Sequence, residues 1–457
     1  MKTRKRRVEF FSFYNHTDIE RHFMKMAQKG WLIESISNLY WTYRKIEPQD
    51  LHFCVTYYPR GSDFDPEPSP EQQTFHDFCA HTGWKLACTW FQMQVFYNEL
   101  GSPIPLETDP VMEVDTLHRA CKKNFLPSYF VMLAVGALLG GYFLARIRYD
   151  PIGLLSDSTH LMTGFACLCL FALSAAELMT YYIWHAKAKK AAQDGLFMET
   201  PGTMKFQWVI LVLLVIVWGG WMIDLFAGDD PLRGWISVVM FVYVFSVMLL
   251  VNGIKRGLKK AGASRGVNRT LTLAACVLIP VVLTSIMIYA GISANRSGVF
   301  SGNPDLRDEI PLSLADFTEI NEDQYIGQER NKQTLLMGQR FVNQFPHWDV
   351  VDSHKLPNLQ YTITTVKVPV LYDWCMEQMF RDLDESLEED VPLGHRHILR
   401  EQDAAPWGAE KAYRTYNEEG WWLDWYLLCY PDKIVEIRFD WEPTAEQTAL
   451  VGKKLNG

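Results

Sequence analysis

Apolar residues gather into five long runs in the middle third of this chain, with mixed polar sequence on either side. The runs cover residues 125–145, 161–184, 206–223, 235–254 and 271–292. Each approaches the roughly 20 residues that a helix needs to cross about 30 Å of hydrocarbon. Because lipid leaves backbone groups no outside partner, such runs span a membrane as helices. We expect five transmembrane helices within residues 125–293; buried core helices are the alternative, disfavoured by five consecutive runs nearly free of charge.

The stretch before the first apolar run alternates between strand and helix patterns, and does so twice. VEFFSFY reads as a strand, residues 18–30 carry apolar positions at helical spacing, and WLIESIS and YWTYRKI read as strands. LHFCVTYY, a helix over 69–83 and the strands WKLACTW and QMQVFYN repeat that order. We expect two βαββ units that form one antiparallel sheet with helices on one face, an α+β domain over residues 1–120.

A shift of 53 residues superimposes the two units. It aligns Gly30 with Gly83 and Trp31 with Trp84. Glycine at a helix end takes the left-handed conformation at low cost, and the Trp that follows is expected to pack back over the helix. The pattern predicts an internal duplication, with chance similarity of the Gly-Trp pairs as the alternative.

Residues 294–457 read as a second soluble α+β domain. The pattern predicts a strand over 359–368, an amphipathic helix over 370–390 and three further strands, AYRTYN, WWLDWYLLCY and KIVEIRFD. The last two are expected to form a hairpin, and TAEQTALVGKKL is expected to form a terminal helix. Thr444 and Gln447 stand at capping-box spacing at its start.

Charge in the connections between the apolar runs predicts how the chain lies across the membrane. Three lysines follow the second run, and six Lys and Arg follow the fourth, whereas DLFAGDDPLR after the third is acidic apart from Arg233. Cytoplasmic connections collect Lys and Arg, so we expect the N-terminus in the cytoplasm and the C-terminus outside. Arg146 and Arg148 after the first run oppose this orientation. Within residues 294–457, 16 Lys and Arg stand against 29 Asp and Glu, which suits an exported acidic part.

The lipid bilayer is the partner that these patterns predict, in the plasma membrane of a multi-pass protein. Basic KTRKRR at residues 2–7 is interpreted as attracted to anionic lipid of the cytoplasmic leaflet. A membrane or regulatory protein is a further candidate partner, and nucleic acid is not expected.

Two features inside the apolar runs are candidates for function. Glu177 lies in the second run, where an acidic residue is costly and usually faces a partner or a wet cavity. The alternative is that it reaches the interface or pairs with a nearby lysine. Gly136 and Gly140 form a GxxxG in the first run, a spacing that lets another helix approach closely, either within the bundle or in a dimer.

A family resemblance rests on MAQKGWLI, on the aromatic strand that ends YRKIEP and on the later GWKL. With a membrane segment after them, these motifs make residues 8–110 resemble the bacterial domain of unknown function family 2812. The resemblance implies a membrane protein, often encoded near PadR-type regulators, and supplies no catalytic residue. The second unit departs from the pattern, with CAHTGW where a second MA motif could stand.

No catalytic motif is present: GxSxG, HExxH, a Walker loop and GxGxxG in a suitable context are all missing. Cys375 and Cys429 share predicted core faces and are a candidate disulfide, with two buried free thiols as the alternative. His395 and His397, together with His347, Asp349 and His354, match no defined metal motif. We expect no cofactor and no metal.

Three functions remain open on the sequence. The first is a non-enzymatic sensor or signal-relay protein with soluble domains on both sides of the membrane. The second is a transporter, or an accessory subunit of one, that uses Glu177. The third, an exported hydrolase that uses carboxylates, has the least support because no carboxylate pair is singled out.

Overall fold

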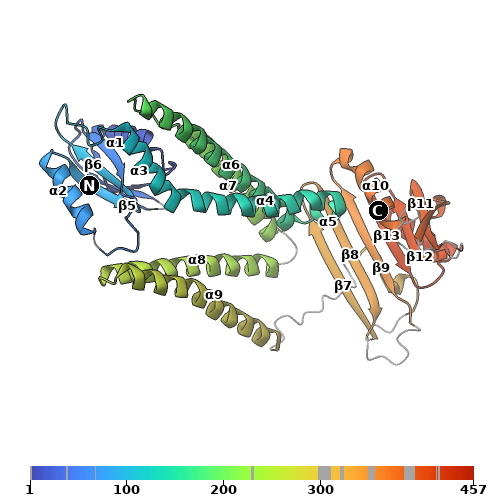
Figure 1. Ribbon diagram of the computed structural model, residues 1–457. Coiled ribbons are helices and arrows are strands. Elements are labelled where there is room, and N and C mark those ends of the chain that lie inside the picture. Colours follow the sequence, from blue (N-terminus) through green and yellow to red (C-terminus); the bar gives the residue numbers. More distant parts are fainter. Residues whose placement is uncertain are drawn as a thin grey trace. The chain divides into compact units, whose positions relative to one another are not determined.

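A computed structural model of the protein describes residues 3–37, 40–66, 68–227, 231–296, 310–319, 324–347, 356–384, 397–417, 419 and 422–456. The chain divides into two compact units, which we describe separately (Figure 1). The first unit contains residues 1–141 and 164–291. The second contains residues 142–163 and 292–457.

The first unit begins with the two βαββ repeats. The first repeat is β1 (Arg4–Arg7), α1 (His16–Gln28), β2 (Trp31–Ile36) and β3 (Trp41–Lys45); the second is β4 (His52–Tyr57), α2 (Pro70–His81), β5 (Lys85–Trp90) and β6 (Met93–Asn98). In the described residues each repeat makes its own three-stranded antiparallel sheet, in the orders β1-β3-β2 and β4-β6-β5. The single shared sheet that we expected is therefore wrong. Strands β2 and β5 of the two sheets lie side by side without forming a ladder.

The duplication extends to fine detail. The ladder of each repeat shifts register at one place, between Ile33 and Ser35 in the first and between Leu86 and Cys88 in the second. These positions are again 53 residues apart. Gly30 and Gly83 end their helices at φ +77° and +85°, the left-handed conformation that glycine tolerates. The register shifts and the helix-ending glycines thus recur at the same offset of 53 residues, which chance similarity of the Gly-Trp pairs alone does not explain.

The first strand is not where the pattern placed it. VEFFSFY, residues 8–14, forms no strand, and β1 lies earlier, over the exposed basic residues Arg4–Arg7. The side chains of residues 8–14 pack on two sides: Tyr14 is fully buried against the ring of Tyr181, whereas Phe11 stacks on Trp41 of β3 and Phe13 packs on Tyr57 of β4. This segment with a strand-like sequence is therefore held by side-chain packing and joins no strand ladder.

Helix α3 (Pro110–Lys123) joins the repeats to the apolar helices and was not predicted. There follow α4 (Phe125–Tyr149), the short α5 (Pro151–Leu155), α6 (Ser158–Gln193), α7 (Met204–Ala227), α8 (Pro231–Lys260) and α9 (Arg265–Arg296). Within the described residues, five helices are long and apolar enough to cross a membrane, each containing one predicted run. All five are longer than those runs because polar residues continue the helix at one or both ends. The most apolar window of α8 has none of its residues buried, which suits a lipid-facing surface.

In the second unit the described strands form a seven-stranded antiparallel sheet of order β10-β11-β12-β13-β9-β8-β7. Its strands are β7 (Tyr325–Gln333), β8 (Met337–Pro346), β9 (Leu359–Val366), β10 (His397–Gln402), β11 (Lys411–Asn417), β12 (Trp422–Cys429) and β13 (Lys433–Phe439). The β12–β13 hairpin is present as expected. Strands β7, β8 and β10 were not predicted, because their sequences are polar and alternate weakly.

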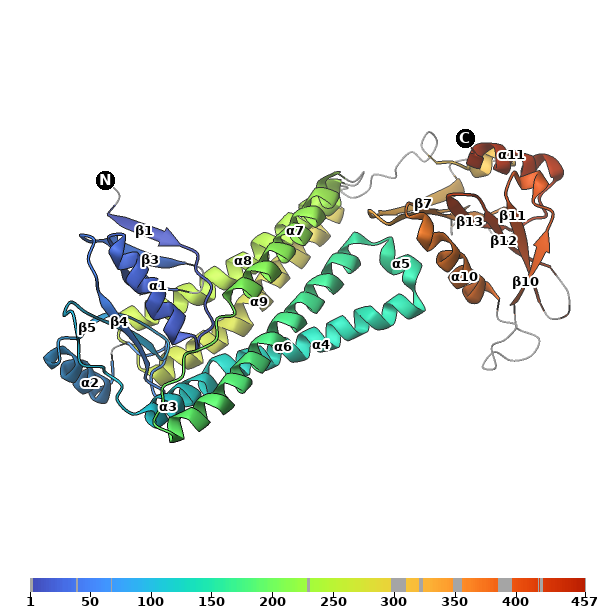
Figure 2. The same cartoon turned by 90° about the horizontal axis from the view of Figure 1, so that it is seen from above.

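Two helices cover opposite faces of this sheet (Figure 2). Helix α11 (Ala445–Asn456) and the short 3-10 helix η1 (Leu314–Asp316) close one core, around Tyr361, Val435 and Phe439. Helix α10 (Tyr372–Leu383) closes the other core, around Met337 and Ile434. The predicted capping box of α11 is present, since Thr444 N donates to Gln447 Oε1 and Gln447 N donates to Thr444 Oγ1. The domain is α+β, as expected.

Candidate functional site

Glu177 sits in the middle of α6 with no exposed surface, and its carboxylate is held by two neutral donors. Ser12 Oγ donates to Glu177 Oε2 at 2.6 Å, and Gln207 Nε2 of α7 donates to Glu177 Oε1 at 2.8 Å. Gln207 Nε2 also donates to Ser12 Oγ at 2.9 Å. Thr203 Oγ1 lies 2.7 Å from Ser12 Oγ. A buried charge needs such bonds, because desolvation without them costs several kcal/mol.

These contacts give Glu177 a partner within its own chain. In them the carboxylate bonds no lysine; it bonds the segment that precedes α1. We use the name "Glu177 network" for Ser12, Glu177, Thr203 and Gln207. The role of Ser12 could not be predicted from the sequence, because a serine within an apolar strand-like stretch is expected to face solvent.

Aromatic rings pack beside the Glu177 network and fasten the same segment to the helices. The ring of Tyr14 lies 5.2 Å from that of Tyr181 on α6 and 5.3 Å from that of Phe125 on α4. Burial raises the pKa of Tyr14, and the charge of Glu177 adds to that shift. The Tyr14 side chain therefore stays neutral near neutral pH. Its ring contacts with α4 and α6 are mainly apolar, and they hold the segment before α1 against these helices.

The connection between α6 and α7 is bonded to the start of α1. Asn15 caps α1 by accepting from Asp18 N, and its Oδ1 also accepts from Thr200 Oγ1 at 2.8 Å. Thr17 N donates to Thr200 Oγ1 at 3.3 Å. The cap residue thus has a second role, since it ties the start of α1 to residues just before α7.

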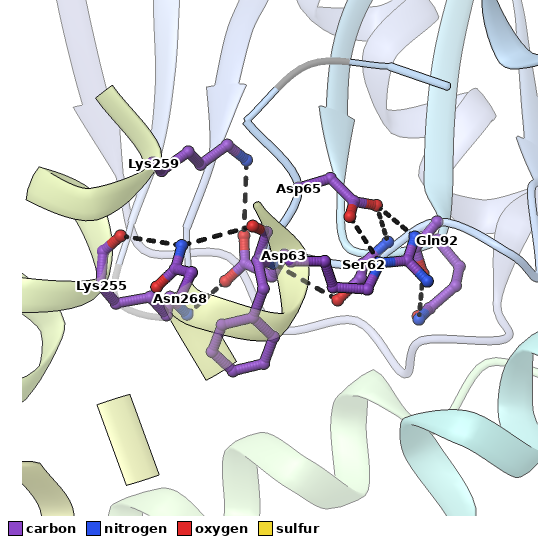
Figure 3. A network of polar contacts seen from close by, with 10 residues as sticks. Ser62, Asp63, Asp65, Gln92, Lys255, Lys259 and Asn268 are labelled. Carbon is purple, nitrogen blue, oxygen red and sulfur yellow. Dashed lines mark hydrogen bonds and ion pairs between the residues drawn. The ribbon is translucent and has the colours of Figure 1, made fainter. Parts of the chain in front are cut away.

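A second polar contact joins the loop after β4 to the connection between α8 and α9 (Figure 3). Asp65 accepts two bonds from Arg265, from Nε to Oδ1 and from Nη2 to Oδ2, both at 2.6 Å. Asp63 pairs with Lys255, and Asn268 donates to the Phe64 carbonyl at 3.3 Å. Lys255, Lys259 and Arg265, which helped to predict the orientation of the chain across the membrane, therefore pair with Asp63 and Asp65 of the loop after β4. We call these contacts the Asp63–Asp65 clamp.

The glycines of the first run pack α4 against α6 of the same chain. A Cβ on Gly136 would lie 2.9 Å from Phe171 N, and one on Gly140 would lie 3.0 Å from Leu168 Cδ2. A Cβ on Gly141 would meet nothing within 4 Å. Of the two expected uses of the GxxxG, the structure thus has close packing within the bundle.

In the second unit the connection between α4 and α6 is fastened to the seven-stranded sheet. Thr334 Oγ1 donates to the Leu155 carbonyl at 2.6 Å, and Lys332 Nζ lies 3.4 Å from Asp157 Oδ2. Ile152 of α5 is buried in the core under α10, with Met337 and Cys375. The residues just before α6 are therefore held by the C-terminal domain.

The cysteines of that domain are not bonded to each other. Cys375 and Cys429 are both free and buried in the core under α10. Cys429 Sγ points to Met376 Sδ at 3.4 Å, so the candidate disulfide is not formed and the alternative of two free thiols holds. Burial raises the pKa of Cys429 to about 12, which keeps it a thiol.

Of the repeat tryptophans, Trp84 is buried with Cys79 of α2, so it packs back over its helix, and its Nε1 donates to the Ile104 carbonyl at 2.8 Å. Trp31 is half-buried, with Lys5 Nζ 5.4 Å from its ring centre. Among the described residues no group of three or more His, Cys, Asp or Glu is placed to hold a metal ion. Asp349, His354 and His395 lie outside the described residues.

The comparisons with known proteins bear on the repeats and the start of α4. Residues 15–130 match the family model described as Protein of unknown function (DUF2812). The resemblance to that family is thereby confirmed, and the matched region reaches through α3 into α4. No curated protein and no solved structure matches the chain. The DUF2812 region contributes Asn15, Asp63 and Asp65 to the contacts above, so the matched residues include those that hold the long helices.

Proposed function

We propose that this multi-pass membrane protein is a non-enzymatic relay, in which the C-terminal domain and the N-terminal repeats act on one another through α4 and α6. One observation carries the proposal: soluble residues hold the same helix at two places. Lys332 pairs with Asp157 just before α6, and Ser12 bonds Glu177 in its middle. A change at one contact can reach the other only if the helix moves or rotates between two arrangements.

The contacts also support the orientation proposed from charge. The N-terminal repeats bond the α6–α7 connection through Thr200 and the α8–α9 connection through Arg265. Those are the two connections in which Lys and Arg predicted the cytoplasmic side. Five crossings then put the C-terminal domain on the extracytoplasmic side of the plasma membrane, with a membrane or regulatory protein as recipient of the signal.

Hydrogen exchange on the full chain in lipid nanodiscs tests the relay. Ile152→Ala removes apolar contact between α5 and the C-terminal core, while Leu335→Ala is the matched control, because Leu335 is 89% exposed in the neighbouring β7–β8 turn. We expect Ile152→Ala to increase exchange at residues 151–157 and to change exchange at residues 9–17. Increased exchange at 151–157 with unchanged exchange at 9–17 would rule out coupling between the two contacts.

A transporter is the second candidate, and the neutral donors around Glu177 favour it. Glu177 is a fully buried acid in a helix that can span a membrane, and its partners in these bonds, Ser12 and Gln207, are uncharged. If the protein couples solute movement to protons, Glu177→Gln abolishes flux in proteoliposomes while insertion is unchanged. Undiminished flux of a transported solute in that variant would exclude this role for Glu177.

A further inference from the structure

A cleft of 340 Å³ opens on the face of the seven-stranded sheet that α11 covers, beside the last turn of that helix. Its floor carries Arg340, Ile363 and Lys433 of three neighbouring strands. The antiparallel register places Arg340 opposite Ile363, and Thr365 opposite Lys433, so these side chains share a face. The cleft lies within the size range of about 300–1,000 Å³ that small-molecule sites have.

The residues at the edge of the cleft come from elements outside the sheet. Pro311 stands just before η1, and Lys454 and Leu455 belong to the last turn of α11. Three separate parts of the domain therefore build the cleft, and its shape depends on their packing.

The charge of the cleft is opposite to that of its domain. Acids outnumber bases by 29 to 16 over residues 294–457, yet four bases line the cleft: Arg340, Lys367, Lys433 and Lys454. Among the described residues that line it there is no Asp or Glu. Bases collected in an acidic domain point to a function other than solubility, because solubility is served by the acidic surface.

Two of these four charges are bonded to backbone oxygens. Lys367 Nζ donates to the Thr334 carbonyl at 2.7 Å, and Lys433 Nζ donates to the Leu455 carbonyl. A carbonyl orients an ammonium group without cancelling its charge. The other two are paired with acids, Arg340 with Glu329 at 2.7 Å and Lys454 with Asp316 at 2.6 Å. The cleft therefore has an excess of about two positive charges, counted over these four contacts.

We propose that this cleft binds a small ligand through an oxyanion group, a phosphate or a carboxylate. Lys367 and Lys433 offer ammonium donors and fixed positive charge to such a group, and Arg340, which is paired with Glu329, lies beside them on a neighbouring strand. Gln333 and Thr365 supply polar groups beside them, and Ile363 supplies apolar contact for the rest of the ligand.

The proposed anion site is separate from the relay, but ligand binding there could start the signal that the relay transmits. Lys367 bonds the Thr334 carbonyl, and Thr334 Oγ1 bonds the Leu155 carbonyl just before α6. An anion that draws the Lys367 ammonium toward itself changes the β7–β8 turn on which Leu155 rests. Binding itself does not require the relay, so the two proposals fail separately.

Calorimetry on the full chain in uncharged detergent tests the site, with inorganic phosphate and succinate as probes. We expect saturable binding of at least one probe, weakened about tenfold by Lys367→Gln and by Lys433→Gln, as expected for one lost charged hydrogen bond. Lys453→Gln is the matched control, since Lys453 neighbours Lys454 on α11 but does not line the cleft. Lys367→Gln keeps the test valid if Lys433→Gln misfolds, because Lys367 is exposed.

Two results would overturn the proposal. One is the absence of saturable binding of either probe at millimolar concentration. The other is an equal loss of affinity in Lys453→Gln and Lys367→Gln. A third arm separates a soluble ligand from a lipid headgroup: phosphate binding is measured in nanodiscs of phosphatidylcholine with and without phosphatidylglycerol. Competition by phosphatidylglycerol assigns the cleft to a headgroup, and unchanged binding assigns it to a soluble anion.

Discussion

Ser12 Oγ donates a 2.6 Å hydrogen bond to Glu177 Oε2, across 165 positions of sequence. This bond joins a segment that looks like a strand to the middle of a helix that looks like a membrane span. It gives the one acidic residue of α6 a partner supplied by the N-terminal part of the chain. The N-terminal repeats and most of the apolar helices are therefore parts of one packed unit rather than a domain and a separate anchor.

Removal of the Ser12 hydroxyl is expected to destabilise the first unit. Ser12→Ala leaves the buried Glu177 carboxylate with one donor fewer, and an unsatisfied buried group costs about 1–3 kcal/mol. The control is Ser128→Ala, because Ser128 is exposed on α4 and bonds only a helix carbonyl among its described contacts. Thermal unfolding of both variants in detergent checks this, and equal midpoints would contradict it.

A side chain at Gly136 is expected to separate α4 from α6. Gly136→Ala places a Cβ 2.9 Å from Phe171 N, and overpacking of this kind costs about 1–3 kcal/mol. Gly141→Ala is the control on the same helix, since its Cβ meets nothing within 4 Å. The loss of unfolding free energy should be confined to the Gly136 variant, because Ala favours a helix more than Gly does. A similar loss in both variants would contradict close packing at Gly136 as the cause.

The Asp63–Asp65 clamp is expected to be weak and sensitive to salt. Arg265 is 51% exposed, and an exposed ion pair contributes about 0.2–1 kcal/mol. Asp65→Asn should increase hydrogen exchange of residues 61–66 at low ionic strength, and the difference from the wild type should shrink in high salt. Arg269→Gln, an exposed base on the same helix, serves as the control. A difference that persists in high salt would assign the effect to loop structure instead.

The N-terminal repeats are expected to lose stability as the pH rises. Burial, with the neighbouring charge of Glu113, raises the pKa of Glu107 to about 7 from its ordinary 4.5. Because the folded state holds this proton more tightly, its contribution is complete below pH 4.5 and is lost as the pH rises through about 7. Glu107→Gln should therefore raise the unfolding midpoint at pH 8 and leave it nearly unchanged at pH 4.5.

The exposed Glu71→Gln on α2 is the matched control for that measurement. Surface substitutions of this kind usually change stability by less than about 0.5 kcal/mol. A midpoint of Glu107→Gln that follows the wild type across the whole pH range would show that Glu107 is ionised and solvated in the folded protein.

The elements that could be predicted are those with a strong local signal. Five apolar runs predicted five long helices, because each run alone meets the length and composition that lipid demands. The helix ends at Gly30 and Gly83, and the capping box at Thr444, depend on neighbouring residues only and were also predicted. Strands β7 and β8 were missed because their polar side chains show little alternation, although the two are neighbours in sequence and pair with each other.

The site depended on contacts that no local pattern contains. The sequence singled out Glu177, since an acid in an apolar run is unusual, but Ser12, Gln207 and Asp65 are ordinary residues in ordinary positions. The cleft at Arg340 was missed for the same reason: its four bases are scattered from residue 340 to residue 454 and meet only when β8, β9, β13 and α11 pack.

By itself, the sequence determined that this protein is built around long apolar helices, that its N-terminal part shows the same order of strand and helix patterns twice, and that its C-terminal part is acidic and has an α+β pattern. These properties follow from composition and short-range periodicity, which are written along the chain. Only the tertiary structure decided that the repeats form two separate sheets, that residues 8–14 form no strand, and that the Glu177 carboxylate accepts a hydrogen bond from Ser12. Such outcomes follow from which distant surfaces bury each other, and burial free energy depends on the partner as much as on the segment.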